Sequence, residues 1–428
     1  MRLGRTFQLA SLLAELDRRL NGPQDAPVAV AVSGGGDSMA LLRLAHLWAA
    51  RSGRRLAVLT VDHGLQSYSG AWVRFVAERA QRLGFSHQTL AWEGPKPAAG
   101  IPEAAREARH RLLAEAARTA GARVVLLGHT ADDRLEAGLM RELGSRVPEP
   151  RPWSPSPAWP QGRGLFLMRP LLDCRRQALR DWLASLGETW IEDPANEDER
   201  SGRTRARRRL AEPPQDFEAP PAVDPSPCRA FDDVEAGLGG DLSLPRDSLA
   251  QSRRLLAALA LCAAGTTRPP RREALDALLE RLASPSAFVR TLAGARIEAS
   301  ADRLAFCREP GELARAQVGE TPLPVGLSVF DGRFAVAAFA PGYAVRPLRG
   351  LAASLPKPER AKLLALPPAV RPGLPLAHGA GLPPFLPSLR AGGPVIARPL
   401  AHERLAAALG AFKDEASLWR VEKLIECP

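Results

Sequence analysis

A short glycine-rich stretch has the composition of a loop that binds phosphate. It consists of Ser33, Gly34, Gly35, Gly36, Asp37 and Ser38. Glycines adopt positive φ angles readily and let backbone N–H groups approach an anion closely. The spacing differs from the Gly-Lys-Ser/Thr ending of a Walker A loop and from the G-x-G-x-x-G of dinucleotide folds. We expect a phosphate group to bind here; the alternative is a turn that only joins two elements.

The richest set of ionisable side chains is His129-Thr130-Ala131-Asp132-Asp133-Arg134-Leu135-Glu136. On a helix that begins near Asp132, the carboxylates of Asp133 and Glu136 lie one turn apart on the same face. Paired carboxylates can hold Mg²⁺, bind an ammonium group or accept a proton from it. Helix capping explains one acidic residue at a helix start, but it explains the whole set less well.

Two further pairs of residues have the chemistry of a binding site. Asp62 and His63 could bind a nucleotide or orient the glycine loop, and a plain structural hydrogen bond explains His63 equally well. Arg106 and Arg109 are three residues apart and share a face of an expected helix. Two guanidinium groups on one face can clamp a phosphate or a carboxylate, and a solvated charged face is the alternative.

The elements that position these residues follow from the hydrophobic pattern. Strands are predicted over 27–32, 55–61, 86–92, 123–128 and 165–172, and helices over 6–21, 39–50, 69–84, 103–120 and 175–186. Asp37 and Ser38 are expected to cap the second of these helices. The alternation predicts an α/β fold with a doubly wound parallel sheet. Ligands bind at the carboxyl ends of such strands, so the polar clusters should converge on one crevice.

The chain is expected to have four parts. They are a catalytic domain over 1–210, a proline-rich linker over 211–239, a mixed α+β middle domain over 240–340 and a small C-terminal region over 341–428. In the middle domain, helices are predicted over 246–264 and 271–283, strands within 288–307, and a hairpin over 329–336 that turns at Asp331-Gly332. Residues 144–164 are expected to form a long loop. Beyond 340, only a helix near 401–411 shows periodicity.

Charge and cysteine usage restrict the functional classes. Of the net charge of +11, +9 lies in residues 1–210, which favours a polyanionic partner beyond a nucleotide. The five cysteines are Cys174, Cys228, Cys262, Cys307 and Cys427. Their scattered spacing suggests neither a zinc site nor disulfides, so we expect reduced thiols in a cytoplasmic protein. No stretch approaches the ~20 apolar residues of a membrane span.

Taken in order, these motifs resemble the tRNA(Ile)-lysidine synthetase family of N-type ATP pyrophosphatases, whose glycine loop is called a PP-loop. The matching stretches are 33–38, Val61-Asp62-His63-Gly64-Leu65, Glu103-Ala104-Ala105-Arg106, 129–136, Arg169-Pro170-Leu171-Leu172 and 192–196. The resemblance runs from about residue 27 to 200, and 240–340 is similar to the middle domain of that family. The family differs at Thr130, Arg134 and Ala137, has an aromatic residue in place of His110, and has a longer glycine-rich run at 144–146.

The resemblance implies a two-step reaction on the isoleucine tRNA with a CAU anticodon. ATP and Mg²⁺ would adenylate the C2 oxygen of cytidine 34, and free L-lysine would then displace AMP to give lysidine. ATP would be bound by residues 33–38 with Asp62, His63 and His129, with Asp132 shaping the nucleotide side. Catalysis would involve Asp37, Asp133 and Glu136. Lysine would be bound by Arg106, Arg109, Asp133 and Glu136. The ligands of the metal stay open, as does the oligomeric state.

Three other readings compete with this one. A tRNA 2-thiolation enzyme of the same loop class needs cysteines near the site, and Cys174 is the residue nearest to a motif. An amidating ligase would carry a glutaminase domain, of which the sequence gives no sign. A non-catalytic RNA-binding protein would not need the intact loop together with Asp133 and Glu136. Arg134 is a candidate phosphate contact.

Overall fold

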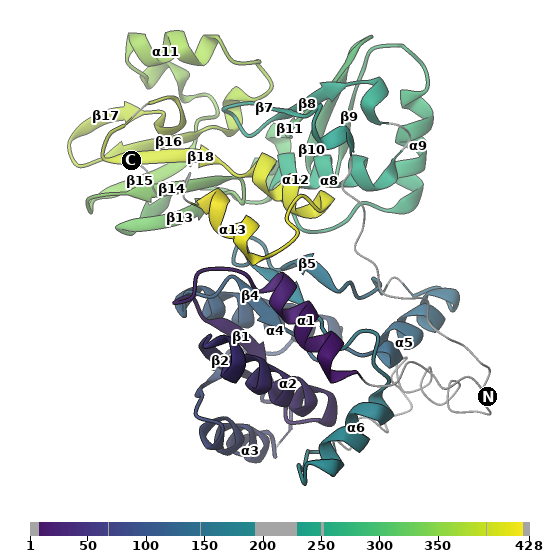
Figure 1. The fold of residues 1–428 in the computed structure, drawn as a ribbon. Helices are drawn as coiled ribbons and strands as arrows, with labels where there is room; N and C mark the ends of the chain where they lie inside the picture. The colour runs from purple at the N-terminus through teal and green to yellow at the C-terminus, as the bar shows by residue number, and fades with distance from the viewer. Residues whose placement is uncertain are drawn as a thin grey trace. The chain divides into compact units, whose positions relative to one another are not determined.

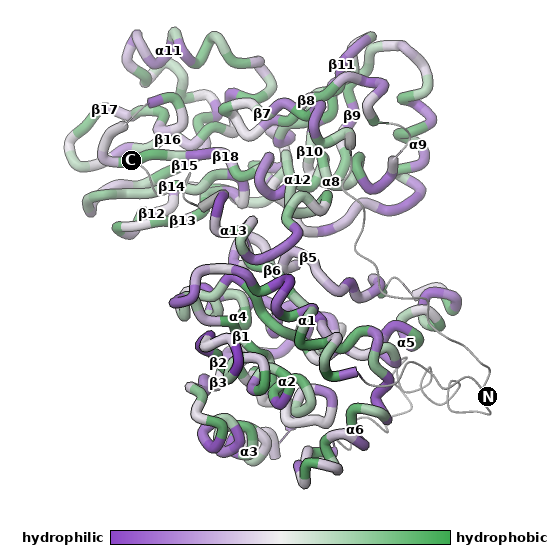
Figure 2. The backbone as a smooth tube through the Cα atoms, viewed as in Figure 1, coloured by the Kyte–Doolittle hydropathy of each residue, from purple (hydrophilic) through white to green (hydrophobic). Residues whose placement is uncertain are grey.

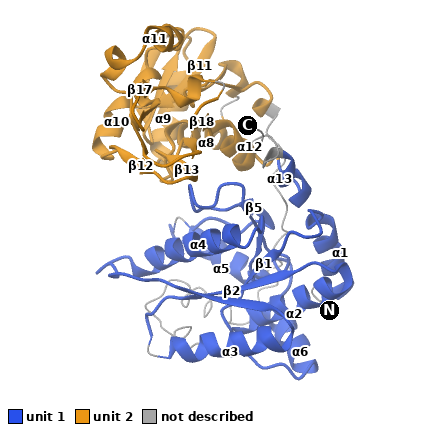
Figure 3. Ribbon diagram, turned by 90° about the vertical axis from the view of Figure 1, so that its left-hand side faces the viewer, with its two compact units in different colours: residues 1–225, 412–427 blue, residues 226–411, 428 orange. Residues whose placement is uncertain are grey.

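The computed structural model describes residues 8–66, 68–145, 147–192, 229–249, 252–390 and 392–422. The chain divides into two compact units (Figure 3), residues 1–225 with 412–427 and residues 226–411 with 428. The expected boundary at 340 lies inside the second unit. Most of the expected linker, up to residue 228, lies outside the described residues. Within the described ranges, no helix has the length and apolar composition needed to cross a membrane.

A six-stranded sheet forms the centre of the first unit, with strand order β3-β2-β1-β4-β6-β5 (Figure 1). Its strands are β1 (Val28–Ala31), β2 (Leu56–Asp62), β3 (Ser86–Ala91), β4 (Val124–Leu126), β5 (Trp153–Pro155) and β6 (Phe166–Met168). The pairs within β3-β2-β1-β4-β6 are parallel, and β5 joins β6 antiparallel. The predicted doubly wound parallel sheet is therefore confirmed. Its order reverses between β1 and β4, where such sheets bind ligands.

Helices connect the strands and cover the sheet. They are α1 (Leu9–Arg19), α2 (Gly36–Ser52), α3 (Ser69–Arg82), α4 (Ile101–Thr119), α5 (Ala131–Glu142), α6 (Arg176–Ser185) and α13 (Glu415–Glu422). One buried cluster joins Leu59, Val125 and Leu167 of the sheet to Leu113 and Ala117 of α4. In Figure 2 hydrophobic colour follows the central strands β1, β2, β4 and β6, while the helices carry both colours. Helix α4 thus buries one face against the sheet, whereas α1 and α6 pack mainly on α2.

Helix α2 begins earlier than predicted. Its first residue is Gly36 and its N-cap is Gly35, so Asp37 and Ser38 lie in the first turn and do not serve as caps. The expectation of a cap at Asp37 or Ser38 was therefore wrong. Glycine has no side chain that can cap the helix, so the loop runs directly into the helical turn. This early start places both polar side chains beside the end of β1.

The predicted long loop over 144–164 contains the edge strand β5. Trp153 is buried, stacks on Phe166 of β6 with ring centroids 5.1 Å apart, and donates its indole N–H to the carbonyl oxygen of Phe412 at 3.0 Å. Prolines flank the tryptophan, and proline is tolerated on an edge strand because one side of such a strand needs no ladder hydrogen bonds. Proline content therefore hid the strand in the sequence.

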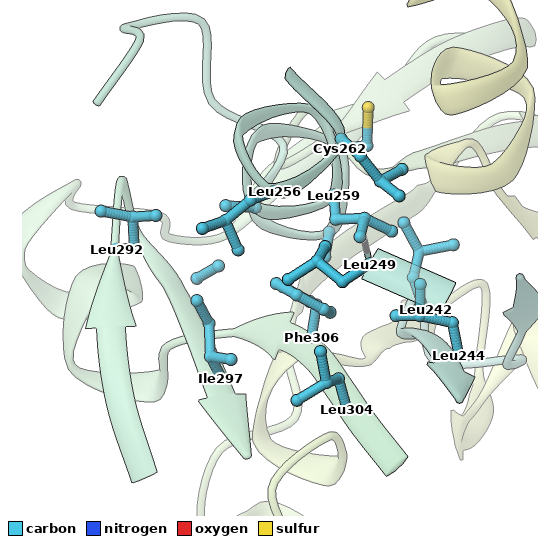
Figure 4. Close-up of a cluster of buried hydrophobic side chains, with 14 of the residues drawn as sticks. Leu242, Leu244, Leu249, Leu256, Leu259, Cys262, Leu292, Ile297, Leu304 and Phe306 are labelled. Carbon is cyan, nitrogen blue, oxygen red and sulfur yellow. The ribbon is translucent and has the colours of Figure 1, made fainter. Parts of the chain in front are cut away.

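The second unit begins with a five-stranded sheet of order β7-β8-β11-β10-β9. Its elements are β7 (Glu235–Ala236), β8 (Leu242–Pro245), α8 (Arg253–Ala264), α9 (Arg272–Leu282), β9 (Phe288–Leu292), β10 (Ala295–Ala299), β11 (Arg303–Arg308) and α10 (Pro310–Arg315). Leu256 and Leu259 of α8 pack on Leu242, Ile297 and Phe306 of the sheet (Figure 4). The helices and strands predicted over 246–307 are therefore present, with shorter bounds.

Two smaller sheets complete the second unit, with orders β12-β15-β16-β17 and β13-β14-β18. Their elements are β12 (Thr321–Leu323), β13 (Gly326–Phe330), β14 (Phe334–Ala338), β15 (Tyr343–Pro347), α11 (Lys357–Leu364), β16 (Pro375–Gly379), β17 (Leu382–Phe385), β18 (Val395–Pro399) and α12 (Ala401–Leu409). The hairpin at Asp331-Gly332 is confirmed. The expectation of little regular structure between 340 and 400 was wrong, because these strands are four or five residues long and several contain proline.

The C-terminal segment 412–422 returns to the first unit. Glu415 accepts hydrogen bonds from both terminal nitrogens of Arg54, at 3.1 and 2.9 Å, and the two side chains are 0% and 2% exposed. The backbone N–H of Gly22 donates to the same carboxylate at 3.0 Å. The guanidinium of Arg123 lies 5.0 Å from the ring centre of Trp419. Arg54 and Arg123 precede β2 and β4, so the segment joins the amino ends of the sheet.

Replacing Glu415 by Gln should destabilise the first unit by about 3–5 kcal/mol, because it leaves the Arg54 guanidinium buried without its counter-charge. All eight tryptophans lie in this unit, so tryptophan fluorescence during urea unfolding reports on it alone. Glu78→Gln is the matched control, because the Glu78–Arg82 pair is exposed and 3.9 Å apart, and its loss should cost less than 1 kcal/mol. Equal unfolding midpoints for the two variants would contradict a stabilising role for the buried pair of Arg54 and Glu415.

Candidate active site

The loop between β1 and α2 has the geometry of an anion site. Gly34 has a φ of +92°, and the Ser38 hydroxyl oxygen accepts hydrogen bonds from the backbone N–H groups of Ser33 and Gly34 at 3.2 and 3.1 Å. The same hydroxyl donates to the carbonyl oxygen of Gly35 at 2.9 Å. No side chain caps α2, so the first N–H groups of this helix can meet an anion. Ser38 therefore shapes the loop from inside.

Close backbone contacts explain two glycines of the site. A Cβ at Gly34 would lie 2.7 Å from the Cδ1 of Ile191, whose N–H donates to the Gly34 carbonyl at 2.9 Å. A Cβ at Gly128, just after β4, would lie 3.0 Å from the carbonyl oxygen of Asp37. The loop is thus held between the end of β4 and Ile191. Residues 193–196 of the last motif lie outside the described part of the chain.

Three carboxylates from two helices meet at one guanidinium. Arg176, the first residue of α6, places its Nε 2.9 Å from Asp37 Oδ2, its Nη1 3.3 Å from Glu136 Oε1 and its Nη2 3.9 Å from Asp133 Oδ2. Its backbone N–H donates to Asp132 Oδ2 at 2.7 Å. These carboxylates raise the pKa of Arg176 despite its burial. The structure therefore brings Asp37, Asp133 and Glu136 together, as the convergence of the strand ends predicts.

Asp133 also has a local structural role. Its Oδ2 accepts hydrogen bonds from the backbone N–H of Thr130 at 2.8 Å and from the Thr130 hydroxyl at 3.1 Å. This is the capping arrangement that the sequence predicts for one acidic residue. Glu136 lies one turn further along the same face and is buried. Capping therefore accounts for Asp133 in part and leaves Glu136 to another role.

Asp37 carries a carboxylate oxygen without a partner. Its Oδ1 is buried and accepts no hydrogen bond from any described residue. Burial raises the pKa of Asp37, against the opposing effect of Arg176. Within the described part of the chain, no three His, Cys, Asp or Glu side chains gather as a metal site. A Mg²⁺ ion at Asp37 would therefore take its other oxygen ligands from water and a bound phosphate, which is the usual arrangement for this ion.

A cationic group of side chains, Arg106, Arg109 and Arg169, lies beside the carboxylates. Burial lowers the pKa of His110 to about 2, and the charges of these three arginines add to that effect. Arg169 donates from Nε to Nδ1 of His129 at 3.2 Å. Burial is also the main cause of the lowered pKa of Arg169, about 10, so the guanidinium stays charged at neutral pH. The arginines of α4 therefore do not form a separate solvated face.

Asp62 ends β2, and His63, which follows it, lies near Arg109. The Asp62 Oδ1 accepts a hydrogen bond from the backbone N–H of Gly64 at 2.9 Å, which fixes the turn after the strand. Burial and the charge of Arg109 lower the pKa of His63. The His63 ring meets the Trp92 ring edge-on, with centroids 6.0 Å apart. Asp62 therefore has a structural contact of its own, and the surroundings of His63 favour its neutral form.

Sequence reasoning missed Arg176 and Ile191. Arg176 begins a helix that follows a strand, as Asp37 and Asp133 do, and this shared position was the available signal. The abundance of arginine in the chain obscured it. The candidate phosphate contact Arg134 is buried instead, with ion pairs to Asp173 at 3.3 Å and Glu149 at 3.5 Å. These acids account for its charge without a phosphate.

Comparison with known proteins agrees with this arrangement. A family model described as a PP-loop domain matches residues 8–213. The chain is 45% identical to the tRNA(Ile)-lysidine synthase of Caulobacter vibrioides, over 96% of this chain and 100% of that protein. It is 40% identical to the tRNA(Ile)-lysidine synthase of Hyphomonas neptunium, over 70% of this chain and 85% of that protein.

Among solved structures, the U34-tRNA thiolase NcsA from Methanococcus maripaludis overlaps 47% of this chain and 71% of its own, at 14% identity and a TM-score of 0.38. That likeness is too low to bear on the activity. The PP-loop match agrees with the glycine loop after β1, and the match to the Caulobacter protein spans the whole of that relative. The chain therefore belongs to the tRNA(Ile)-lysidine synthase family of ATP-dependent, tRNA-modifying PP-loop enzymes.

Proposed function

We propose that this enzyme joins free L-lysine to C2 of cytidine 34 in the isoleucine tRNA with a CAU anticodon, in the cytoplasm. In the first step the C2 oxygen attacks the α-phosphorus of ATP and pyrophosphate leaves. In the second step the amine nitrogen of lysine attacks C2, the C2–O bond breaks, and AMP leaves with the oxygen. The observation that carries this proposal is the meeting of the glycine loop's Asp37 with Asp133 and Glu136 around Arg176.

The nucleotide side of the site would be formed by residues 33–38 with Asp62, His63 and His129. The N–H groups at the start of α2 suit the β- and γ-phosphates, whose charge grows as pyrophosphate departs. The unpartnered Asp37 Oδ1 could hold a Mg²⁺ ion that binds with the nucleotide. When bound, Mg²⁺ would neutralise charge on the triphosphate and on the leaving pyrophosphate. Asp37 would thus hold the metal beside the reacting phosphorus.

The lysine side would be formed by Asp133, Glu136, Arg106 and Arg109. Carboxylates suit the ammonium group of lysine, and guanidinium groups suit its carboxylate. The ammonium must lose a proton before its nitrogen can attack, and a carboxylate within hydrogen-bond reach can take that proton. Without substrate, Arg176 balances the charge of the acids, since a buried carboxylate needs a counter-charge.

The state of the cysteines favours lysine transfer over thiolation. Cys174, Cys262 and Cys307 are buried, free thiols. Burial raises the pKa of Cys174 to about 11, so its thiol stays protonated at neutral pH. A thiolate is the form that transfers sulfur or binds a cluster. The other two cysteines lie outside the described residues. Among the described cysteines, Cys174 is therefore a poor carrier of sulfur.

Incubation of the enzyme with ATP, Mg²⁺, labelled lysine and a transcript of the CAU isoleucine tRNA should place the label on the RNA. The elongator methionine tRNA, which carries the same anticodon, is the control and should take up no label. Omission of ATP should abolish the incorporation. Absence of label from the isoleucine transcript under conditions that release pyrophosphate would contradict lysine as the second substrate.

Glu136→Gln should raise the KM for lysine by about 10–100-fold, because the ammonium loses a buried charged partner worth about 1.5–3 kcal/mol. Adenylation without lysine, measured as pyrophosphate release in a single turnover, should change much less. Glu142→Gln on the exposed end of the same helix is the matched control and should leave both values unchanged. An unaltered KM for lysine in Glu136→Gln would remove this residue from the lysine site.

A further inference from the structure

Arg169 fixes the surroundings of His129 through several hydrogen bonds. The residue follows β6 and is 7% exposed. Its Nη1 donates to the carbonyl oxygen of Arg151 at 2.9 Å and to the Ser154 hydroxyl oxygen at 3.0 Å. Its backbone N–H donates to the carbonyl oxygen of Pro152 at 2.8 Å. The guanidinium is thus held to the strand β5, and its Nε points at Nδ1 of His129 from 3.2 Å.

This contact determines where the proton of His129 lies. A guanidinium group has only donors, so the Nδ1 of His129 must accept with its lone pair. A neutral imidazole whose Nδ1 accepts carries its proton on Nε2. Protonation of Nδ1 would set one N–H against another and place two positive charges beside each other. The contact therefore favours the neutral ring with the proton on Nε2.

Cationic side chains share the surroundings of His129. Burial and the charges of Arg109, Arg106 and Arg169 lower the pKa of His110 to about 2, and His129 contributes to the same lowering. The charge of Asp133 of α5 acts on Arg169 in the opposite direction and partly offsets the lowering of its pKa by burial. The positive charge of Arg169, which contacts the ring directly, therefore adds to the cost of a protonated His129.

We propose that Arg169 is a positioning residue that keeps His129 neutral in the Nε2–H tautomer, so that His129 donates a hydrogen bond and does not carry a proton. In the reaction proposed above, on which this role rests, the Nε2–H would donate to an anionic oxygen of the nucleotide. The proton of the lysine amine would then go to a carboxylate, Asp133 or Glu136. His129 would stay outside the acid–base chemistry.

The test is nitrogen NMR of full-length protein with ¹⁵N-labelled histidine, with the His129 signals assigned by their loss in His129→Asn. In the wild type we expect an unprotonated Nδ1 and a protonated Nε2 that do not titrate between pH 6 and 8. Arg169→Met removes the donor, and His129 should then titrate near the ordinary histidine pKa of about 6.5. Arg169→Gln, whose amide N–H can still donate to Nδ1, should preserve the tautomer.

Activity gives a second measure of the same property. The ratio of kcat at pH 8 to kcat at pH 6 should be about fourfold larger for Arg169→Met than for the wild type, since about three quarters of an ordinary histidine is protonated at pH 6. Arg169→Gln should resemble the wild type. A wild-type His129 with the proton on Nδ1, or one that titrates between pH 6 and 8, would overturn the proposal.

The NMR test of the His129 tautomer does not depend on whether the enzyme transfers lysine. The NMR spectra need neither tRNA nor lysine, so a failure of lysine transfer would leave the tautomer result valid. Arg169→Met removes a buried charge, and thermal melting shows whether it folds. If it does not fold, the spectra of the wild type and of Arg169→Gln show whether His129 has the proposed tautomer. A changed tautomer in Arg169→Gln with an unchanged one in Arg169→Met would also contradict the role of the donor.

Discussion

The charge balance around Arg176 is the constraint on which the site depends. Asp37, Asp133 and Glu136 are partly or fully buried at the carboxyl edge of a parallel sheet, and buried carboxylates need a counter-charge. The sheet places Arg176 beside these carboxylates, because the loop after β1, the helix α5 after β4 and the helix α6 after β6 all begin at the same edge. The fold therefore brings Asp37 of the glycine loop and the acids Asp133 and Glu136 into contact with the same side chain, Arg176.

Contacts outside the site hold this edge in place. Ser154 of β5 fixes Arg169, and the neighbouring Trp153 bonds to the carbonyl oxygen of Phe412. The C-terminal segment that carries Phe412 is itself held by the buried pair of Arg54 and Glu415. The described C-terminal segment thus supports the strand that positions Arg169. The first unit combines this segment with the N-terminal part of the sequence, although the residues between them form a separate compact unit.

The sequence predicted the sheet, the glycine loop and the convergence of the acids, because these depend on local patterns. Buried strands, a glycine turn and helical spacing are visible within about twenty residues. Contacts between distant residues left no such pattern. Arg54 and Glu415 are separated by 361 positions, and nothing near either residue indicates the other. Arg169 and His129, 40 positions apart, are a similar case, in a chain where arginine is too common to stand out.

Short strands were the other feature of the fold that could not be predicted from the sequence. The strand β5 has three residues, of which the last is a proline, and the strands beyond residue 340 are four or five residues long. Alternation of polar and apolar residues cannot be recognised over so few positions. Their stability comes from burial against neighbours, such as the packing of Trp153 on Phe166, which composition alone does not reveal. The helix start at Gly36 was missed for a similar reason, since a glycine cap has no side chain.

The central claim is that a base oxygen of the RNA attacks the α-phosphorus of ATP and later leaves with AMP. The most direct test uses isoleucine tRNA with ¹⁸O at C2 of cytidine 34, and mass spectrometry of the AMP released with lysine. The account predicts one ¹⁸O atom in the phosphate of that AMP. AMP without ¹⁸O, or with an oxygen derived from the carboxylate of lysine, would contradict it.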